Sequence, residues 1–359
     1  MLRNLYNKFF PIPEFLSSSS FGLDISEESI KFTELIMTKD GIRLGRYGER
    51  EVPAGVIESG KIKNLKKLEE ILTSLKKDEK IKSVRVSLPE EQVYLFRIKL
   101  EKEGLEEVRE GIEFSLEEHI PIPAQDVIFD YEILNEDNKN LYVQVVAISK
   151  NIIENYLLAL ENSEIPVLFF ELEAQSLVRA VVKKGDLETY MIVDFGKRRT
   201  GIAIVSQGVL MFTSTIDMGG VVLSNLIQKS LKISFEEAEK MKQQYGLSRD
   251  SKNKEIFSIL LNGVSVLCDE ISKHFLFWNT NKEENNKNHP LIKKIILCGG
   301  DSNLIGLSDY LSANMKIKVE TANVWINISD TEKYIPEINF EQSLSYATAI
   351  GLALGNFEK

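Results

Sequence analysis

Two aspartates, Asp24 and Asp194, each end a short apolar run and are each followed by a small polar turn. In both FGLDISEESIKFTEL (21–35) and MIVDFGKRRTGIAIVSQGVL (191–210), a second apolar or alternating run follows the turn. This pattern predicts a strand, a tight turn and a second strand, with an acid at the mouth of the hairpin. One such hairpin is most simply structural, but its use twice in one chain is hard to explain by coincidence.

The residues of the two turns suit a phosphate site. Backbone N–H groups in tight turns of small residues form concave anion sites. Two carboxylates beside such a site can hold Mg²⁺ through its water molecules, because this ion keeps much of its hydration shell and takes few carboxylates. We therefore expect Asp24 and Asp194 to face a magnesium ion and the phosphates that accompany it.

A third stretch, IKKIILCGGDSNLIGLSDYL (292–311), predicts a buried strand, a double glycine and a helix. Gly299 and Gly300 permit close approach of a ligand to the backbone. Ser302 and Asn303 favour helix N-caps, where free amides attract anions or polar ligands. A double glycine after a strand is common and by itself indicates little. It becomes informative because it follows the two hairpins in the chain and precedes the small-residue helix SYATAIGLALG (345–355). Together these stretches predict a nucleotide between two lobes.

Composition limits the classes of protein that fit. The chain has 359 residues, 43 % of them apolar, which is enough for two lobes that each carry a sheet. Its formal charge of −10 argues against nucleic-acid binding. The sequence has no run of eighteen apolar residues and no secretory leader pattern, which predicts a cytoplasmic protein. Cys268 and Cys298 form no paired framework, and the three scattered histidines suggest no zinc site.

The elements that must position these residues predict an α/β protein with an inserted α+β subdomain. The N-terminal segment is a short amphipathic helix that could dock on the rest of the protein or lie on a membrane. We expect it to dock on the protein. The predicted segments are residues 1–20, this N-terminal helix; 21–91, the first lobe; 92–165, the inserted subdomain; 166–190, the first lobe continued; 191–345, the second lobe; and 346–359, a helix returning to the first lobe.

In this order, the three stretches resemble the phosphate-1, phosphate-2 and adenosine segments of the actin-like ATPase superfamily. Within it the chain is most similar to the PilM family of type IV pilus assembly proteins, relatives of the cell-division protein FtsA. The likeness runs from about Phe21 to Gly355. It includes EEHIPIPAQDVIFDYEI (117–133) and VPAGVIESGKIKN (52–64), which nucleotide binding alone does not require.

The resemblance implies ATP and Mg²⁺ as cofactors and assigns roles to single residues. The implied nucleotide-binding residues are Asp24, Ser26, Ser29, Lys31, Asp194, Gly196, Thr200, Glu239, Lys242, Gly299, Gly300, Ser302 and Asn303, with Asp24 and Asp194 also at the metal. Glu173 matches the acid near the attacking water, with Gln175 as a substitute. Two of these assignments have an alternative. Glu239 and Lys242 are either at the nucleotide or an ordinary exposed pair on the helix FEEAEKMKQQYG (235–246). Glu173 is either the acid near the attacking water or a buried structural acid.

The first loop departs from the family pattern. Ser26 stands where the family usually has glycine, and a serine at positive φ costs roughly 1–2 kcal/mol, so we expect a different loop shape. Glu27 and Glu28 add negative charge where phosphates would lie. The basic run Lys197–Arg199 offsets this charge by charge-assisted contacts, unless it is simply a solvated turn. We expect ATP binding, and hydrolysis that is slow at most.

The resemblance implies an ATP-binding scaffold of type IV pilus or related secretion assembly, at the inner face of the cytoplasmic membrane. Its expected partner is the N-terminal peptide of a PilN-like inner-membrane protein, held in a groove at the inserted subdomain, with other pilus assembly proteins as further candidates. One alternative is an FtsA-like division filament protein, although GLALGNFEK at the end leaves no C-terminal amphipathic helix. A small-molecule kinase is the other, but the sequence shows no motif for its catalytic aspartate.

Overall fold

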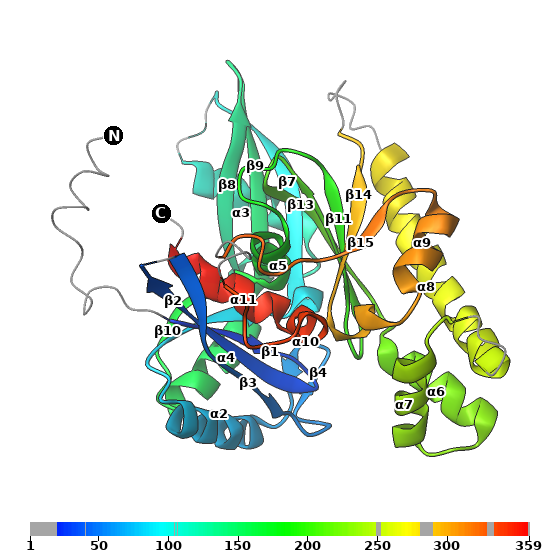
Figure 1. Cartoon of the computed structure of the whole chain (residues 1–359). Coiled ribbons are helices and arrows are strands. Elements are labelled where there is room, and N and C mark those ends of the chain that lie inside the picture. Colours follow the sequence, from blue (N-terminus) through cyan, green and yellow to red (C-terminus); the bar gives the residue numbers. More distant parts are fainter. Residues whose placement is uncertain are drawn as a thin grey trace.

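The computed structural model describes residues 20–39, 41–103, 105, 107–248, 253–280, 290–328 and 334–357. In this part of the chain two five-stranded sheets form the centres of two lobes (Figure 1). The predicted N-terminal helix falls almost wholly on residues 1–19, outside the described residues.

The first sheet has the strand order β10-β6-β1-β2-β3. Its strands are β1 (Phe21–Ile25), β2 (Ser29–Thr38), β3 (Gly41–Glu51), β6 (Val84–Leu88) and β10 (Val167–Leu172). β1 and β2 are antiparallel, with Asp24 opposite Lys31, while β6 runs parallel to both β1 and β10. The predicted hairpin at Asp24 is confirmed, and Asp24 lies near the carboxyl end of a central strand.

The second sheet repeats this topology in the order β13-β12-β11-β14-β15. Its strands are β11 (Tyr190–Phe195), β12 (Thr200–Ser206), β13 (Val209–Ile216), β14 (Lys294–Cys298) and β15 (Val319–Thr321). β11 and β12 pair antiparallel with Asp194 opposite Gly201, and β14 runs parallel to β11 and β15. The repeated hairpin is therefore part of a repeated sheet, and Asp24 and Asp194 hold equivalent positions.

Two helices lie between the sheets, α5 (Glu173–Val181) and α11 (Ala347–Leu354). One apolar core contains buried residues of both sheets and of both helices. A Cβ on Gly22 of β1 would collide with the Ala349 carbonyl and lie 2.7 Å from the Ala353 nitrogen. The small residues of the predicted helix 345–355 thus let the α11 backbone pack directly against the backbone of β1. In this position the first turn of α11 lies at the space between the lobes.

The outer faces of the sheets are covered by the remaining long helices (Figure 1). These are α2 (Leu65–Glu79) and α4 (Lys150–Asn162) on the first lobe, and α6 (Gly220–Leu231), α7 (Phe235–Tyr245), α8 (Lys254–Thr280) and α9 (Leu307–Met315) on the second. Shorter elements are β4 (Ile57–Glu58), β5 (Lys61–Ile62) and α10 (Phe340–Ser343). None of the helices in the described ranges combines the length and apolar character that a membrane span needs.

A third sheet, β7-β9-β8, is separate in its strand pairing from the two lobe sheets and lies beside β13 of the second lobe (Figure 1). Its strands are β7 (Val93–Glu101), β9 (Asn140–Ser149) and β8 (Val127–Glu136), and α3 (Val108–His119) covers its core. Helix α4, which the sequence analysis assigned to this inserted unit, contributes Ile152, Tyr156 and Leu160 to the first-lobe core instead. Its apolar face repeats at helical spacing and packs toward α2, so α4 is structurally part of the first lobe.

Candidate functional site

A cavity of about 630 Å³ opens between the lobes, a volume typical of small-molecule sites. Both Asp hairpins, the double glycine and the first turn of α11 line it. Among its lining residues are Asp24, Ser26, Glu27, Glu28, Ser29, Lys31, Glu49, Ser87, Glu90, Glu91, Glu173, Asp194, Gly196, Lys197, Arg198, Arg199, Gly201, Glu239, Gln243, Gly299, Gly300, Asp301, Ser345 and Thr348.

The carboxyl groups of Asp24, Asp194 and Glu173 line this cavity together, and each of the three residues is partly buried. Burial, with a smaller contribution from the charge of Asp24, raises the pKa of Asp194 to about 7. Burial and the charges of Asp24 and Asp194 raise the pKa of Glu173 well above its usual value. Burial also raises the pKa of Asp24, although Lys31 and a hydrogen bond of 2.9 Å from the Ser87 hydroxyl oppose this.

A bound cation would relieve the mutual repulsion of these three carboxyl groups. Within the described ranges no group of three or more His, Cys, Asp or Glu side chains is arranged as a complete metal-ligand set. Two or three oxygen donors that leave room for water and a ligand fit Mg²⁺, which takes few protein carboxylates. The donor set thus fits the predicted magnesium ion, and Asp24 and Asp194 would be the residues that hold it.

Glu90 is a further buried acid of the cavity that the sequence analysis did not identify. Its Oε2 accepts a hydrogen bond of 3.1 Å from the amide of Ala174, in the first turn of α5. Its Oε1 is also buried. Burial raises the pKa of Glu90. No sequence signal marked this residue, because it follows Pro89 beyond the strand and meets Glu173 only in the folded protein.

The two glycines of the third stretch have different roles. Gly299 has φ +88, and a Cβ there would collide with Asp194 Oδ1 and lie 2.6 Å from the Phe195 carbonyl oxygen. A Cβ on Gly300 would have Ser345 Cβ as its nearest neighbour, at 3.4 Å. Only glycine fits at position 299, because its turn packs directly against the end of the Asp194 strand.

Ten of the predicted site residues line the cavity. They are Asp24, Ser26, Ser29, Lys31, Glu173, Asp194, Gly196, Glu239, Gly299 and Gly300. Ser26 has no positive φ. Its backbone amide and hydroxyl both donate to the Ser29 carbonyl, at 3.0 and 2.8 Å. Ser26 therefore avoids the positive φ that would strain a serine, and the expected difference from the family's loop stays a prediction.

Five predicted site residues lie elsewhere. Thr200 is buried and its hydroxyl donates to the Met218 carbonyl at 2.6 Å, because alternation along β12 turns Gly201, not Thr200, toward the cavity. Gln175 is exposed and lines a different cavity. It stands two positions after Glu173, and two positions on a helix are about 200° apart.

Ser302 and Asn303 do not cap a helix. They belong to a 3₁₀ turn, Gly300–Asn303, whereas α9 begins at Leu307. The Ser302 hydroxyl donates to the Gly299 carbonyl at 2.6 Å, and the Asn303 amide donates to the Glu341 carbonyl at 2.8 Å. Both side chains hold the turn from behind, so the predicted N-cap anion site at these residues is wrong.

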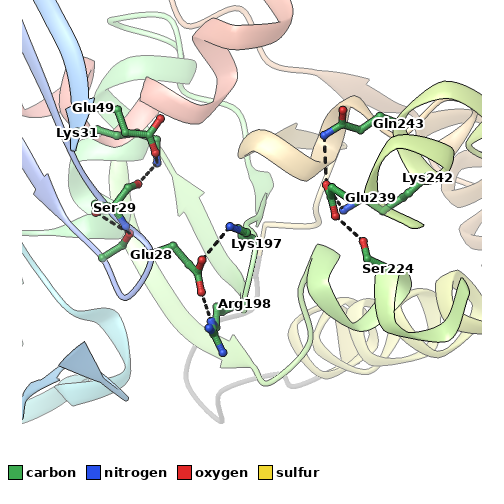
Figure 2. A network of polar contacts seen from close by, with 11 residues as sticks. Glu28, Ser29, Lys31, Glu49, Lys197, Arg198, Ser224, Glu239, Lys242 and Gln243 are labelled. Atoms are coloured by element: carbon green, nitrogen blue, oxygen red, sulfur yellow. Dashed lines mark hydrogen bonds and ion pairs between the residues drawn. The ribbon is translucent and has the colours of Figure 1, made fainter. Parts of the chain in front are cut away.

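Lys242 is buried and does not line the cavity. Its Nζ lies 2.5 Å from Asp301 Oδ1 and 3.0 Å from Glu239 Oε1. Figure 2 shows Glu239 held between Lys242, Ser224 and Gln243. The sequence predicted that Lys242 either contacts the nucleotide or belongs to an exposed pair, and neither is observed. Lys242 is buried and holds two cavity-lining acids, Asp301 and Glu239, on the side away from the cavity.

A second cavity, of about 550 Å³, lies between the third sheet, α5 and the turn between β12 and β13. Apolar side chains from all of these elements line it, including Leu95, Tyr131, Val146, Leu172, Val178, Val209, Leu210, Leu354 and Phe357. Strand β8, which contributes Tyr131, is an edge strand. The amide of Gln144 in β9 donates to the Leu210 carbonyl at 2.6 Å, which ties the third sheet to the second lobe beside this cavity.

The family model of the type IV pilus assembly protein PilM matches residues 22–357. The chain belongs to this family. A solved PilM-PilN type IV pilus biogenesis complex has a similar chain, with a TM-score of 0.79 and 20 % identity over 96 % of this chain and 100 % of that one. The PilM family membership predicted from the three stretches and the two branch-specific segments is thus confirmed.

More distant relatives share the fold. MreB5 of Spiroplasma citri bound to ADP has a TM-score of 0.57 and 13 % identity, covering 93 % of this chain and 95 % of that one. The predicted actin-like α/β fold is confirmed. Cell division protein FtsA of Bacillus subtilis (strain 168) is 27 % identical over 153 residues, 40 % of this chain. The chain spans about a third of that relative, 35 % of its length, so the PilM match is the broader one.

Proposed function

We propose that this PilM family member is a nucleotide-binding scaffold of type IV pilus assembly that recruits the cytoplasmic N-terminus of a PilN-like inner-membrane protein. The family match across residues 22–357 carries this proposal. The two cavities supply its two binding sites: the cleft between the Asp hairpins for nucleotide, and the cavity beside the third sheet for peptide. The protein would then act at the inner face of the cytoplasmic membrane through its partner.

The ligand of the first cavity is ATP with Mg²⁺ in this proposal. A structural neighbour of this chain, MreB5, is solved with ADP, which supports a nucleotide in this fold. In this proposal Asp24 and Asp194 would hold the ion through its water molecules, and the Gly299 turn, which packs against the end of the Asp194 strand, would support that carboxylate. The bound ion supplies positive charge that offsets the phosphates and the buried carboxyls.

In this proposal Glu173, which lines the cavity, would orient a water molecule near the phosphates. Glu90 holds the first turn of α5 through the Ala174 amide. In this proposal turnover is slow, because Glu27 and Glu28 of the first loop bring negative charge to the cavity that would hold the phosphates. The protein then works as a binding switch more than as an enzyme.

The second cavity suits an extended peptide with apolar side chains. Edge strand β8 offers unpaired backbone groups, to which a peptide adds main-chain hydrogen bonds while its side chains fill apolar pockets. The solved complex contains PilN together with a chain of the same fold, which supports a PilN-like peptide as the occupant.

The experiment is a titration of the full-length protein into a labelled peptide from the N-terminus of the PilN-like protein encoded with it. Leu95→Glu and Val209→Glu place a charge on opposite walls of the cavity and should each weaken binding at least about tenfold, roughly 1.4 kcal/mol. Phe114→Glu is the matched control, because Phe114 is 86 % exposed on α3 and lies outside this cavity. No binding by the wild type, or equal binding by all three variants, would contradict the proposed site.

A further inference from the structure

Side chains of the second phosphate loop reach across the cleft and pair with acids of the first lobe (Figure 2). Lys197 Nζ lies 2.8 Å from Glu28 Oε2, and the Arg198 guanidinium pairs with the other oxygen, Oε1. Arg199 instead pairs with Glu91 at 2.8 Å and Glu27 at 3.3 Å. The three basic residues and the three acids all line the first cavity. Lys197 and Arg198 remain exposed to solvent while they make these ion pairs, and Arg199 is partly buried.

The backbone that carries Lys197 and Arg198 is fixed. The Val221 amide, at the start of α6, donates to the Lys197 carbonyl at 2.9 Å. A Cβ on Gly219 would lie 2.6 Å from the Lys197 carbonyl carbon, so the loop packs tightly on the turn before α6. Because the backbone is held, the side chains of Lys197 and Arg198 are the parts able to change partner.

The partner that they hold is an anion at the mouth of a cavity proposed to bind phosphates. Burial alone would raise the pKa of Glu28, but hydrogen bonds from Lys197 and Arg198 lower it. Glu28 thus presents an ionised carboxylate to two cations, which is the arrangement that basic residues make with a phosphate group. On the first-lobe side, the Glu28 carbonyl accepts from the Val52 amide at 2.9 Å, which holds the hairpin turn in place.

We propose that the Glu28 carboxylate occupies the place of a ligand phosphate, and that Lys197 and Arg198 exchange Glu28 for a terminal phosphate when a nucleoside polyphosphate binds. This inference rests on the proposed nucleotide site and names the residues that select among nucleotides. A terminal phosphate has three acceptor oxygens and more charge than a carboxylate, so it competes well for the two cations. A nucleoside monophosphate, whose single phosphate lies nearer the nucleoside, gains little from the exchange.

The test is calorimetric titration of nucleotide-free, full-length protein with ATP, ADP and AMP in the presence of Mg²⁺. Glu28→Gln removes the internal competitor and should tighten ATP binding about tenfold, with AMP changed less than about twofold. Glu27→Gln is the matched control, since it makes the same change of charge in the neighbouring residue, which pairs with Arg199. A Lys197→Gln/Arg198→Gln double variant should lose most of the preference for ATP over AMP.

The outcomes test the exchange of Glu28 for a phosphate separately from the nucleotide site itself. Equal tightening by Glu27→Gln and Glu28→Gln shows a general charge effect and overturns the inference. The inference also fails if the wild type binds ATP and Glu28→Gln binds it no better. Binding by Glu28→Gln alone supports it, with the carboxylate as a strong internal inhibitor. Absence of binding in all folded variants, checked by circular dichroism, contradicts the nucleotide site itself.

Discussion

Replacement of Asp194 by asparagine should stabilise the ligand-free protein above pH 7. Asp194 is partly buried beside Asp24 and Glu173, and this burial raises its pKa to about 7. An ionised Asp194 therefore costs free energy in the folded state, and that cost is absent when the side chain is a neutral amide of nearly the same shape.

The size and sign of the effect follow from proton linkage. The unfolded chain loses the Asp194 proton near pH 3.8, whereas the folded protein keeps it until about pH 7. Between these values unfolding releases a proton, so the free energy of unfolding falls as pH rises and levels off above about pH 7. With about 1.4 kcal/mol for each pH unit, the wild type loses up to about 4 kcal/mol across this window. The asparagine side chain of the Asp194→Asn variant does not titrate, so this variant escapes the loss.

The assay is urea unfolding of the ligand-free protein at pH 5 and pH 8. The difference in unfolding free energy between Asp194→Asn and the wild type should increase between these two values. Asp269→Asn, on the exposed side of α8, serves as a control that should follow the wild type at both pH values. Parallel pH dependence of Asp194→Asn and the wild type, or a less stable Asp194→Asn at pH 8, would refute the electrostatic account of the site.

Two further predictions concern the Gly299 turn and Glu173. Gly299→Ala should lower the unfolding free energy by at least about 2 kcal/mol, because its backbone conformation alone costs an alanine about 1–3 kcal/mol. Gly300→Ala should change it by less than about 0.5 kcal/mol, since its Cβ has room; equal losses in urea unfolding would contradict this reasoning. Glu173→Gln should leave the dissociation constant for ATP within about threefold and reduce any phosphate release, and unchanged release would remove Glu173 from that role.

The sequence predicted the features that depend on repeated local pattern. Asp24 and Asp194 could be found because each ends an apolar strand before a small turn, and the repeated sheets place them at equivalent positions. The sequence also predicted that the basic run offsets the charge of Glu27 and Glu28, but the direct ion pair between Lys197 and Glu28 is seen only in the structure.

The direction of single side chains could not be predicted in the same way. Thr200 and Gly201 are adjacent, and only the register of β12 decides which one faces the cavity. Lys242 was predicted at the ligand because its helix resembles the segment that flanks the nucleotide in the family. Its burial in the structure depends on the ion pair with Asp301, which is far away in the sequence. Glu90 illustrates the same limit, because its partner in α5 is brought close only by tertiary packing.

The central claim is that a magnesium nucleotide binds between the two Asp hairpins, and thermal unfolding tests it most directly. Nucleotide-free wild type should melt at a higher temperature with Mg²⁺ and ATP, since a ligand at about a hundred times its dissociation constant adds roughly 2.7 kcal/mol to stability. Asp194→Ala should lose this shift, whatever its own melting temperature is. A wild type with no shift at millimolar ATP and Mg²⁺, or a full shift in Asp194→Ala, would contradict the claim.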